Sequence, residues 1–153
     1  MIEIVDYTED KKEFIKTLNY EWLQKYFSIE PIDVLQLSDP KKEIIDKGGM
    51  IFYALYKGEI AGTASLLKVD NESYELGKMA TTKDAQGMGI GKKLLQHCID
   101  AATAAGAKKI ILYSNTKLTP AIHLYKKFGF TQIPLLDSHY VRSNIVMKKM
   151  LET

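Results

Sequence analysis

The chain has 153 residues, of which 46% are hydrophobic and 26% charged, and its formal net charge is +2. We expect one folded domain spanning residues 1–153, because this length and balance suit a single hydrophobic core. The small net charge gives no indication of a nucleic-acid partner or of an anionic membrane. Cys98 is the only cysteine, which excludes an intrachain disulfide.

Neither a membrane-span pattern nor a signal-peptide pattern is visible in the sequence. No apolar run approaches the length of a membrane-spanning helix. The N-terminal residues lack a charged stretch followed by an apolar stretch, so they do not resemble a signal peptide. We therefore expect a cytoplasmic protein with no membrane partner.

The first predicted elements are a strand over residues 2–7 and a long helix. Asp10 and Glu13 have the spacing of a capping box, which predicts that the helix begins there. Helical spacing of apolar residues supports this helix. The recurring residues are Phe14, Leu18, Trp22 and Tyr26.

The rest of the chain alternates between strand and helix patterns. Further strands are predicted at residues 50–56, 59–67, 74–81, 108–114, 130–133 and 145–149, and further helices at 32–37, 40–47, 89–105 and 120–128. Cys98 lies on the apolar face of the helix at 89–105, where it is typical of a small buried hydrophobe. This order predicts an α/β (α+β) fold with a mixed sheet flanked by helices.

A glycine-rich turn at residues 86–92 is the most informative segment. It follows a predicted strand and opens a helix, so its backbone N–H groups and the helix dipole favour an anion such as a pyrophosphate. A dinucleotide fingerprint is excluded because its third glycine is replaced by Lys92. A P-loop is excluded because Gln86 and Lys93 stand where glycine and serine or threonine are needed.

Gln86, Gly89 and Gly91 form a Q-x-x-G-x-G pattern, which resembles the acetyl-CoA pyrophosphate loop of the GNAT N-acetyltransferase superfamily. A second segment, Ala121-Ile122-His123-Leu124-Tyr125-Lys126-Lys127-Phe128-Gly129-Phe130, resembles the superfamily's C-terminal A-x-x-x-Y-x-K-x-G-F motif. Asn115 precedes it, although many members place this asparagine closer to the alanine. Residues 75–81 resemble the strand that pairs with the pantetheine arm, and the resemblance covers essentially the whole chain.

The resemblance implies a single GNAT domain with a mixed, mainly antiparallel sheet. It also implies acetyl-CoA as co-substrate, held where the strands at 74–81 and 108–114 separate, with backbone contacts at Met79 and Thr81. The implied cofactor-binding residues are Met79, Ala80, Thr81, Gln86, Gly87, Met88, Gly89, Ile90, Gly91, Lys92, Asn115 and Tyr125. Family members often form homodimers, and the sequence leaves a homodimer open.

The implied reaction is acetyl transfer to a primary amine by direct attack. Tyr125 matches the tyrosine that protonates the departing thiolate, and a phenol is protonated at neutral pH. Glu75 matches the general base by its distance from Gln86, with an ordered water as the alternative base. On the acceptor side we place Trp22, Tyr26, Glu30 and Tyr140, together with Asp33 and His139.

Several alternatives stay open. A non-catalytic acyl-CoA-binding or sensing module would carry the same cofactor motifs, whereas the failed spacings disfavour a nucleotide-binding regulatory domain. The acceptor remains a polyamine, an amino acid, an aminoglycoside, a protein lysine or a protein N-terminus. The three histidines and one cysteine lack metal-ligand spacing, so we expect no metal site.

Overall fold

The computed structural model describes residues 1–135 and 140–152 of the chain. In this part, one sheet runs through the molecule in the order β1-β2-β3-β4-β5-β7-β6. The strands are β1 (Ile2–Asp6), β2 (Met50–Tyr56), β3 (Glu59–Lys68), β4 (Ser73–Thr81), β5 (Lys109–Ser114), β6 (Thr131–Ile133) and β7 (Ile145–Met150).

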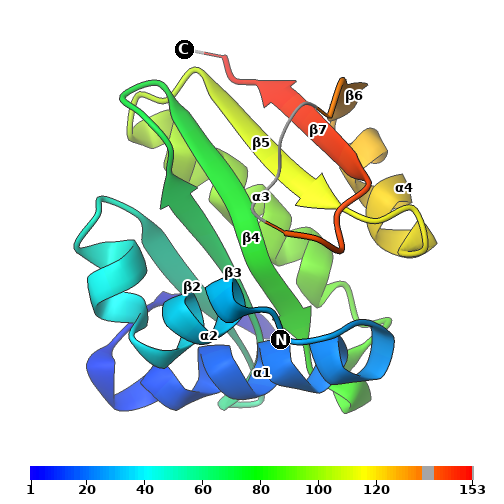
Figure 1. Cartoon of the computed structure of the whole chain (residues 1–153). Coiled ribbons are helices and arrows are strands. Elements are labelled where there is room, and N and C mark those ends of the chain that lie inside the picture. Colours follow the sequence, from blue (N-terminus) through cyan, green and yellow to red (C-terminus); the bar gives the residue numbers. More distant parts are fainter. Residues whose placement is uncertain (136–139, 153) are drawn as a thin grey trace.

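Helices cover both faces of the sheet. Figure 1 shows α1 and α2 on one face, and α3 on the other. The main helices are α1 (Lys12–Tyr26), α2 (Pro31–Ser38), α3 (Ile90–Ala104) and α4 (Thr119–Lys127). Short helical turns are η1 (Glu9–Lys11), η2 (Lys41–Ile45) and η3 (Lys83–Ala85). No helix in the described residues is long and apolar enough to cross a membrane.

Strand pairing confirms the predicted mixed, mainly antiparallel sheet. The pairs β1–β2, β2–β3, β3–β4, β5–β7 and β6–β7 are antiparallel, whereas β4 and β5 run parallel. A tight turn joins β2 to β3, with φ of 53° at Lys57 and 81° at Gly58. Positive φ at both central residues matches the twist of a two-residue hairpin.

Strand β2 shows why helices are needed on both faces. Phe52 and Ala54 belong to the core cluster that includes Leu94 of α3. Ile51 and Tyr53 point to the opposite face, where they belong to a second cluster that includes Ile15 of α1. Successive side chains of a strand alternate between faces, so an apolar run such as β2 must be covered twice.

The start of α1 differs from the prediction. Asp10 lies inside η1, and α1 begins at Lys12 without a side-chain cap, so the predicted capping box is wrong. A capping box occurs instead at α2, between Glu30 and Asp33. Asp10 is not the N-cap because the extended residue that precedes the first helical turn is Thr8, two positions earlier.

The buried face of α1 also differs from the predicted row. Phe14 and Tyr26, at the two ends of that row, are 45% and 49% exposed. A row of i, i+4 positions turns about 40° around the helix at each step, so its ends leave the core. The residues that α1 buries are Ile15, Leu18, Asn19 and Leu23.

Candidate functional site

A cavity of about 740 Å³ lies where β4 and β5 separate. Parallel pairing of the two strands runs from Ser73 to Leu76 on β4, although β4 continues to Thr81. The β3–β4 register gains one extra residue on β4, where Lys78 has φ of 53°. Such a bulge bends a strand, so the second half of β4 diverges from β5 and borders the cavity.

The glycine-rich loop forms one part of the cavity wall. Gly87 and Gly89 have φ of 83° and 80°, and Gly89 is the N-cap of α3. The first helical hydrogen bond joins the Lys93 N–H to the Gly89 carbonyl at 3.1 Å. The N–H groups of residues 87–92 make no hydrogen bond within the described part of the chain, which is the arrangement that binds an anion.

Nearly all of the predicted cofactor-binding residues line this cavity. Met88 is the exception, since it lies outside the lining and its side chain is exposed. The predicted residues that do line it are Met79, Ala80, Thr81, Gln86, Gly87, Gly89, Ile90, Gly91, Lys92, Asn115 and Tyr125. The Asn115 amide already donates to the Arg142 carbonyl at 2.7 Å, so it also holds the segment after β6.

Tyr125 reaches the cavity from α4 and is largely buried. Its ring packs against Phe130, with 5.9 Å between ring centroids. Burial raises the pKa of the Tyr125 hydroxyl to about 12, with a smaller contribution from Cys98. The hydroxyl therefore keeps its proton at neutral pH and is a potential proton donor in the cavity.

Cys98 is fully buried in the α3 core, as predicted for a small hydrophobe. Burial raises the pKa of its thiol to about 12. A protonated, inaccessible thiol is a poor nucleophile, so Cys98 has no part in the chemistry of the cavity.

Glu75 and Tyr140 meet inside the cavity although they lie far apart in the sequence. The Tyr140 hydroxyl donates to Glu75 Oε2 at 3.0 Å, and both side chains are buried. Burial, followed by the charge and hydrogen bond of Glu75, raises the pKa of Tyr140 above its usual value. Glu75 is therefore a buried, positioned carboxylate in the cavity lining.

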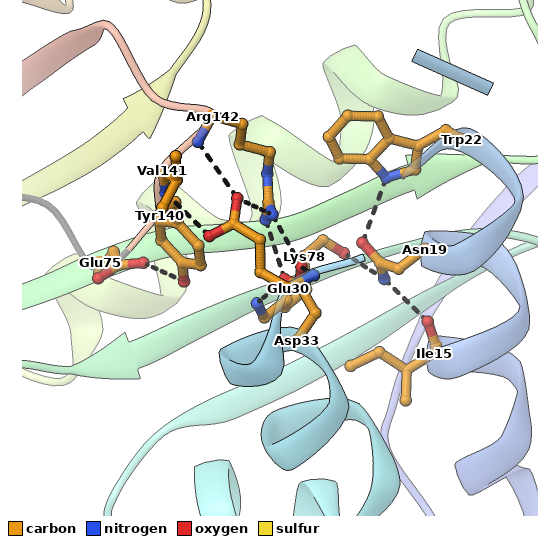
Figure 2. A network of polar contacts seen from close by, with 10 residues as sticks. All are labelled: Ile15, Asn19, Trp22, Glu30, Asp33, Glu75, Lys78, Tyr140, Val141 and Arg142. Atoms are coloured by element: carbon orange, nitrogen blue, oxygen red, sulfur yellow. Dashed lines mark hydrogen bonds and ion pairs between the residues drawn. The ribbon is translucent and has the colours of Figure 1, made fainter. Parts of the chain in front are cut away.

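A network of buried charges lies in the part of the cavity that we predicted as the acceptor side (Figure 2). The Arg142 guanidinium donates to Asp33 through Nη1 at 2.8 Å and Nη2 at 2.9 Å. Lys78 Nζ lies 3.3 Å from Asp33 Oδ1. Burial opposes ionisation of Asp33, but the hydrogen bonds from Arg142 and the Glu30 N–H, with the charges of Lys78 and Arg142, lower its pKa. Burial lowers the pKa of Lys78, and Asp33 opposes this shift.

Glu30 stands at the edge of this network, outside the cavity lining. Its carboxylate accepts the backbone N–H groups of Val141 at 2.8 Å and Arg142 at 3.2 Å. The Arg142 guanidinium adds a third bond at 3.1 Å. Glu30 thus joins the start of α2 to residues 141–142, and its oxygens are engaged by the protein itself.

Aromatic side chains at the end of α1 complete the wall, and Trp22 and Tyr26, which we predicted on the acceptor side, are among them. Trp22, Tyr26 and Phe27 all line the cavity. Trp22 packs edge-to-face on Phe27, with 5.9 Å between centroids, and its indole N–H donates to Asn19 Oδ1 at 3.3 Å. The Asn19 amide in turn donates to the Lys78 carbonyl at 3.1 Å, which ties this wall to the bulge in β4.

The histidines contribute little to the described site. His97 packs edge-on against Phe52 at 4.5 Å between ring centroids, and His123 is exposed. Neither lines the cavity. His139, predicted on the acceptor side, lies outside the described residues. Within residues 1–135 and 140–152, no group of three or more His, Cys, Asp or Glu residues is arranged to hold a metal ion.

Lys78 and Arg142, the two cations of the network, were not predicted as site residues. A lysine inside an otherwise apolar strand pattern was a signal for Lys78, because a buried lysine needs a partner. The segment around Arg142 carries no pattern that marks it. Its partners lie more than a hundred positions away, at separations of 109 and 112 residues.

Comparison with known proteins adds independent evidence. The family model described as "Acetyltransferase (GNAT) family" matches residues 14–130. The uncharacterised N-acetyltransferase YvbK of Bacillus subtilis is 33% identical over 114 residues, covering 72% of this chain and 73% of YvbK.

Solved structures share the fold at lower sequence identity. A GNAT-family acetyltransferase from Staphylococcus aureus superposes with a TM-score of 0.88 at 24% identity, covering 99% of this chain and 100% of that one. The putative acetyltransferase yncA of Salmonella typhimurium, solved with acetyl-CoA, gives 0.77 at 19% identity, covering 99% and 94%.

Proposed function

Because the chain belongs to the acetyltransferase (GNAT) family, we propose that it transfers an acetyl group from acetyl-CoA to a primary amine. One observation carries the proposal. A single cavity is lined both by the glycine-rich loop at residues 86–92 and by the buried side chains of Glu75 and Tyr125. The groups for anion binding and those for proton transfer therefore line the same cavity. We place the catalytic domain at residues 1–153.

The cofactor side of the proposal uses backbone groups. The N–H groups of residues 87–92 bind the pyrophosphate, and Lys92 adds a positive charge to the cavity lining. Met79 and Thr81 on the diverging half of β4 pair with the extended pantetheine arm as a strand would. Support comes from the Salmonella relative of the same fold, which was solved with acetyl-CoA.

The chemical step is direct attack of a neutral amine on the thioester carbonyl. A C–N bond forms, the C–S bond breaks, and the departing sulfur takes a proton from the Tyr125 hydroxyl. Glu75 accepts the amine proton directly or through a water, while Tyr140 holds its carboxylate in place. Alignment of the two substrates contributes much of the rate, since effective molarities reach about 10⁵ M or more.

Release of free thiol from acetyl-CoA, measured across a panel of primary amines, tests the proposal. Calorimetric binding of acetyl-CoA alone is measured beside it. We expect acetyl-CoA binding and thiol release with at least one class of amine. Binding without release would favour the alternative of a non-catalytic acyl-CoA-binding module, and absence of binding would contradict the assignment of the loop.

A further inference from the structure

The charged residues that line the cavity contain more cations than acids. Lys92 lies in the glycine-rich loop, next to the proposed pyrophosphate site. We assign the other charged residues of the lining to the acceptor side. The charged residues of the lining are Asp33, Glu75, Lys78, Lys92, Lys117 and Arg142. The charge that an acceptor meets depends on which of these groups are already neutralised.

Both acids of the lining are engaged. The Asp33 side chain is 0% exposed and bonds with Arg142, Lys78 and the Glu30 N–H. Glu75 is buried and accepts the Tyr140 hydroxyl. A polyamine or an aminoglycoside carries several positive charges and needs several accessible carboxylates, which the described lining of this cavity does not offer.

Two of the cations retain hydrogen-bond donors, although the charge of Arg142 is already paired with Glu30 and Asp33. A guanidinium has five N–H donors, and Arg142 uses three of them, leaving two without a partner in the described residues. Lys117 is exposed and makes no ion pair in residues 1–135 and 140–152. Its Nζ lies 6.0 Å above the centre of the Phe27 ring, beside the aromatic wall of the cavity.

Arg142 and Glu75 both contact the side chain of Tyr140. The Arg142 guanidinium carbon lies 4.7 Å above the centre of the Tyr140 ring, and the hydroxyl of the same ring meets Glu75 at 3.0 Å. One tyrosine side chain therefore separates the cation from the proposed base. Trp22 and Phe27 provide an apolar surface in the lining of the same cavity.

We propose that the acceptor is an amine that also carries a carboxylate, an amino acid with an apolar side chain. Arg142 and Lys117 bind the carboxylate through charge-assisted hydrogen bonds, and the amine faces Glu75. The side chain packs on Trp22 and Phe27. This inference rests on the proposed acetyl transfer and names the substrate class of the same cavity.

The test compares matched acceptors in the thiol-release assay. Phenylalanine, leucine and methionine are each compared with the corresponding amino-acid amide, and spermidine represents the polycations. We expect kcat/KM to be at least about tenfold higher for the carboxylates than for the amides, the size of one charge-assisted hydrogen bond. A preference for spermidine, or no preference for the carboxylates, would overturn the inference.

Variants assign the preference to residues. Lys117→Gln should reduce the carboxylate-to-amide ratio severalfold by raising KM for the carboxylates, whereas the surface control Lys126→Gln on α4 should leave the ratio unchanged. Comparing the carboxylate-to-amide ratio of each variant with that of the wild type cancels the different basicity of the amines. Arg142→Gln should reduce the ratio further, and thermal unfolding checks that this variant folds. An unchanged ratio in Lys117→Gln and in folded Arg142→Gln would contradict the assignment.

A binding measurement separates failure of this inference from failure of the proposed function. N-acetylphenylalanine and N-acetylphenethylamine are titrated into the CoA-loaded protein by calorimetry. We expect tighter binding of the carboxylate compound, and a severalfold smaller preference for it in Lys117→Gln. Such binding without thiol release from any amine would contradict the proposed reaction and leave the carboxylate site intact. Thiol release that favours spermidine, or equal binding of the two acetylated compounds, would contradict the carboxylate site and leave the proposed reaction intact.

Discussion

At the scale of single residues, Tyr125 shows how burial suits a side chain to a proton transfer. Its pKa of about 12 keeps the hydroxyl protonated well above neutral pH. We expect Tyr125→Phe to lower kcat about a hundredfold, since general acid catalysis is worth about 10² to 10⁴. Acetyl-CoA affinity should stay nearly constant because the phenyl ring still packs against Phe130. Thiol release with a chemistry-limited amine and calorimetric titration measure the two effects.

The pH profile provides the matched check on Tyr125. An acid works while protonated, so a pKa raised from 10 to about 12 moves the loss of activity to higher pH. The wild-type kcat should therefore show no Tyr125-dependent decline between about pH 8 and 10. Equal rates for the wild type and Tyr125→Phe, measured with an amine for which the chemical step is rate-limiting, would remove Tyr125 from the mechanism.

At the scale of elements, the start of α3 carries the proposed pyrophosphate site. Gly89→Glu places a carboxylate beside the N–H groups of residues 87–92. Like charges in close contact cost several kcal/mol, so acetyl-CoA affinity should fall about a hundredfold or more. Calorimetric titration of acetyl-CoA measures this loss, and circular dichroism confirms that α3 is retained.

Gly89→Asn is the control for this substitution. Gly89 has φ of 80°, which strains most side chains, but asparagine adopts this conformation more readily than other residues and carries no charge. It should retain most of the affinity. If the two variants lost the same affinity, backbone strain would explain the effect and the charge argument would fail.

The elements also show what local sequence can predict. The Gln86-Gly89-Gly91 pattern predicted a loop at the end of a strand and the start of a helix, and the structure confirms β4, the loop and α3 in that order. This pattern could be recognised because its residues are close together in the sequence. The sequence predicted a capping box at Asp10 and Glu13, whereas the structure has one at Glu30 and Asp33. Both pairs have the same spacing, but Asp10 lies inside η1.

The contacts among the predicted acceptor-side residues could not be predicted in this way. Tyr140 meets Glu75 across 65 positions, and Arg142 meets Asp33 across 109. No periodicity connects such residues, since the sheet order brings them together. The sequence placed Glu30 and Asp33 on the acceptor side without indicating that both carboxylates form ion pairs with Arg142.

At the scale of the whole molecule, Asp33 connects three distant segments. Its carboxylate joins the start of α2 to Lys78 on β4 and to Arg142 before β7. Removing one partner of a buried ion pair leaves unpaired charge and costs about 3–5 kcal/mol. We expect Asp33→Asn to lower the free energy of unfolding by about 3 kcal/mol in urea titrations at neutral pH.

Asp46→Asn is the matched control for this loss. The Lys41–Asp46 pair has a similar distance of 2.9 Å, but both side chains are about half exposed. Exposed pairs contribute about 0–1 kcal/mol, so this variant should unfold almost like the wild type. Equal destabilisation by the two substitutions would show that Asp33 holds no special place in the fold.

The pH dependence of the same difference tests whether charge, rather than packing, makes Asp33 important. Its pKa is lower in the folded protein than the usual value of about 3.9. A lowered pKa stabilises the folded state fully above the unfolded value, and this contribution is lost as pH falls through the folded value. The difference in unfolding free energy between the wild type and Asp33→Asn should therefore be largest near pH 7 and shrink below about pH 4. Asp10 and Asp70, whose pKa values are also lowered, are present in both proteins and cancel in the difference. If the charge of Asp33 is what matters, wild-type protein with a protonated Asp33 should unfold like Asp33→Asn. A difference in unfolding free energy that stays constant from about pH 7 to 3 would therefore assign the loss to side-chain packing and not to charge.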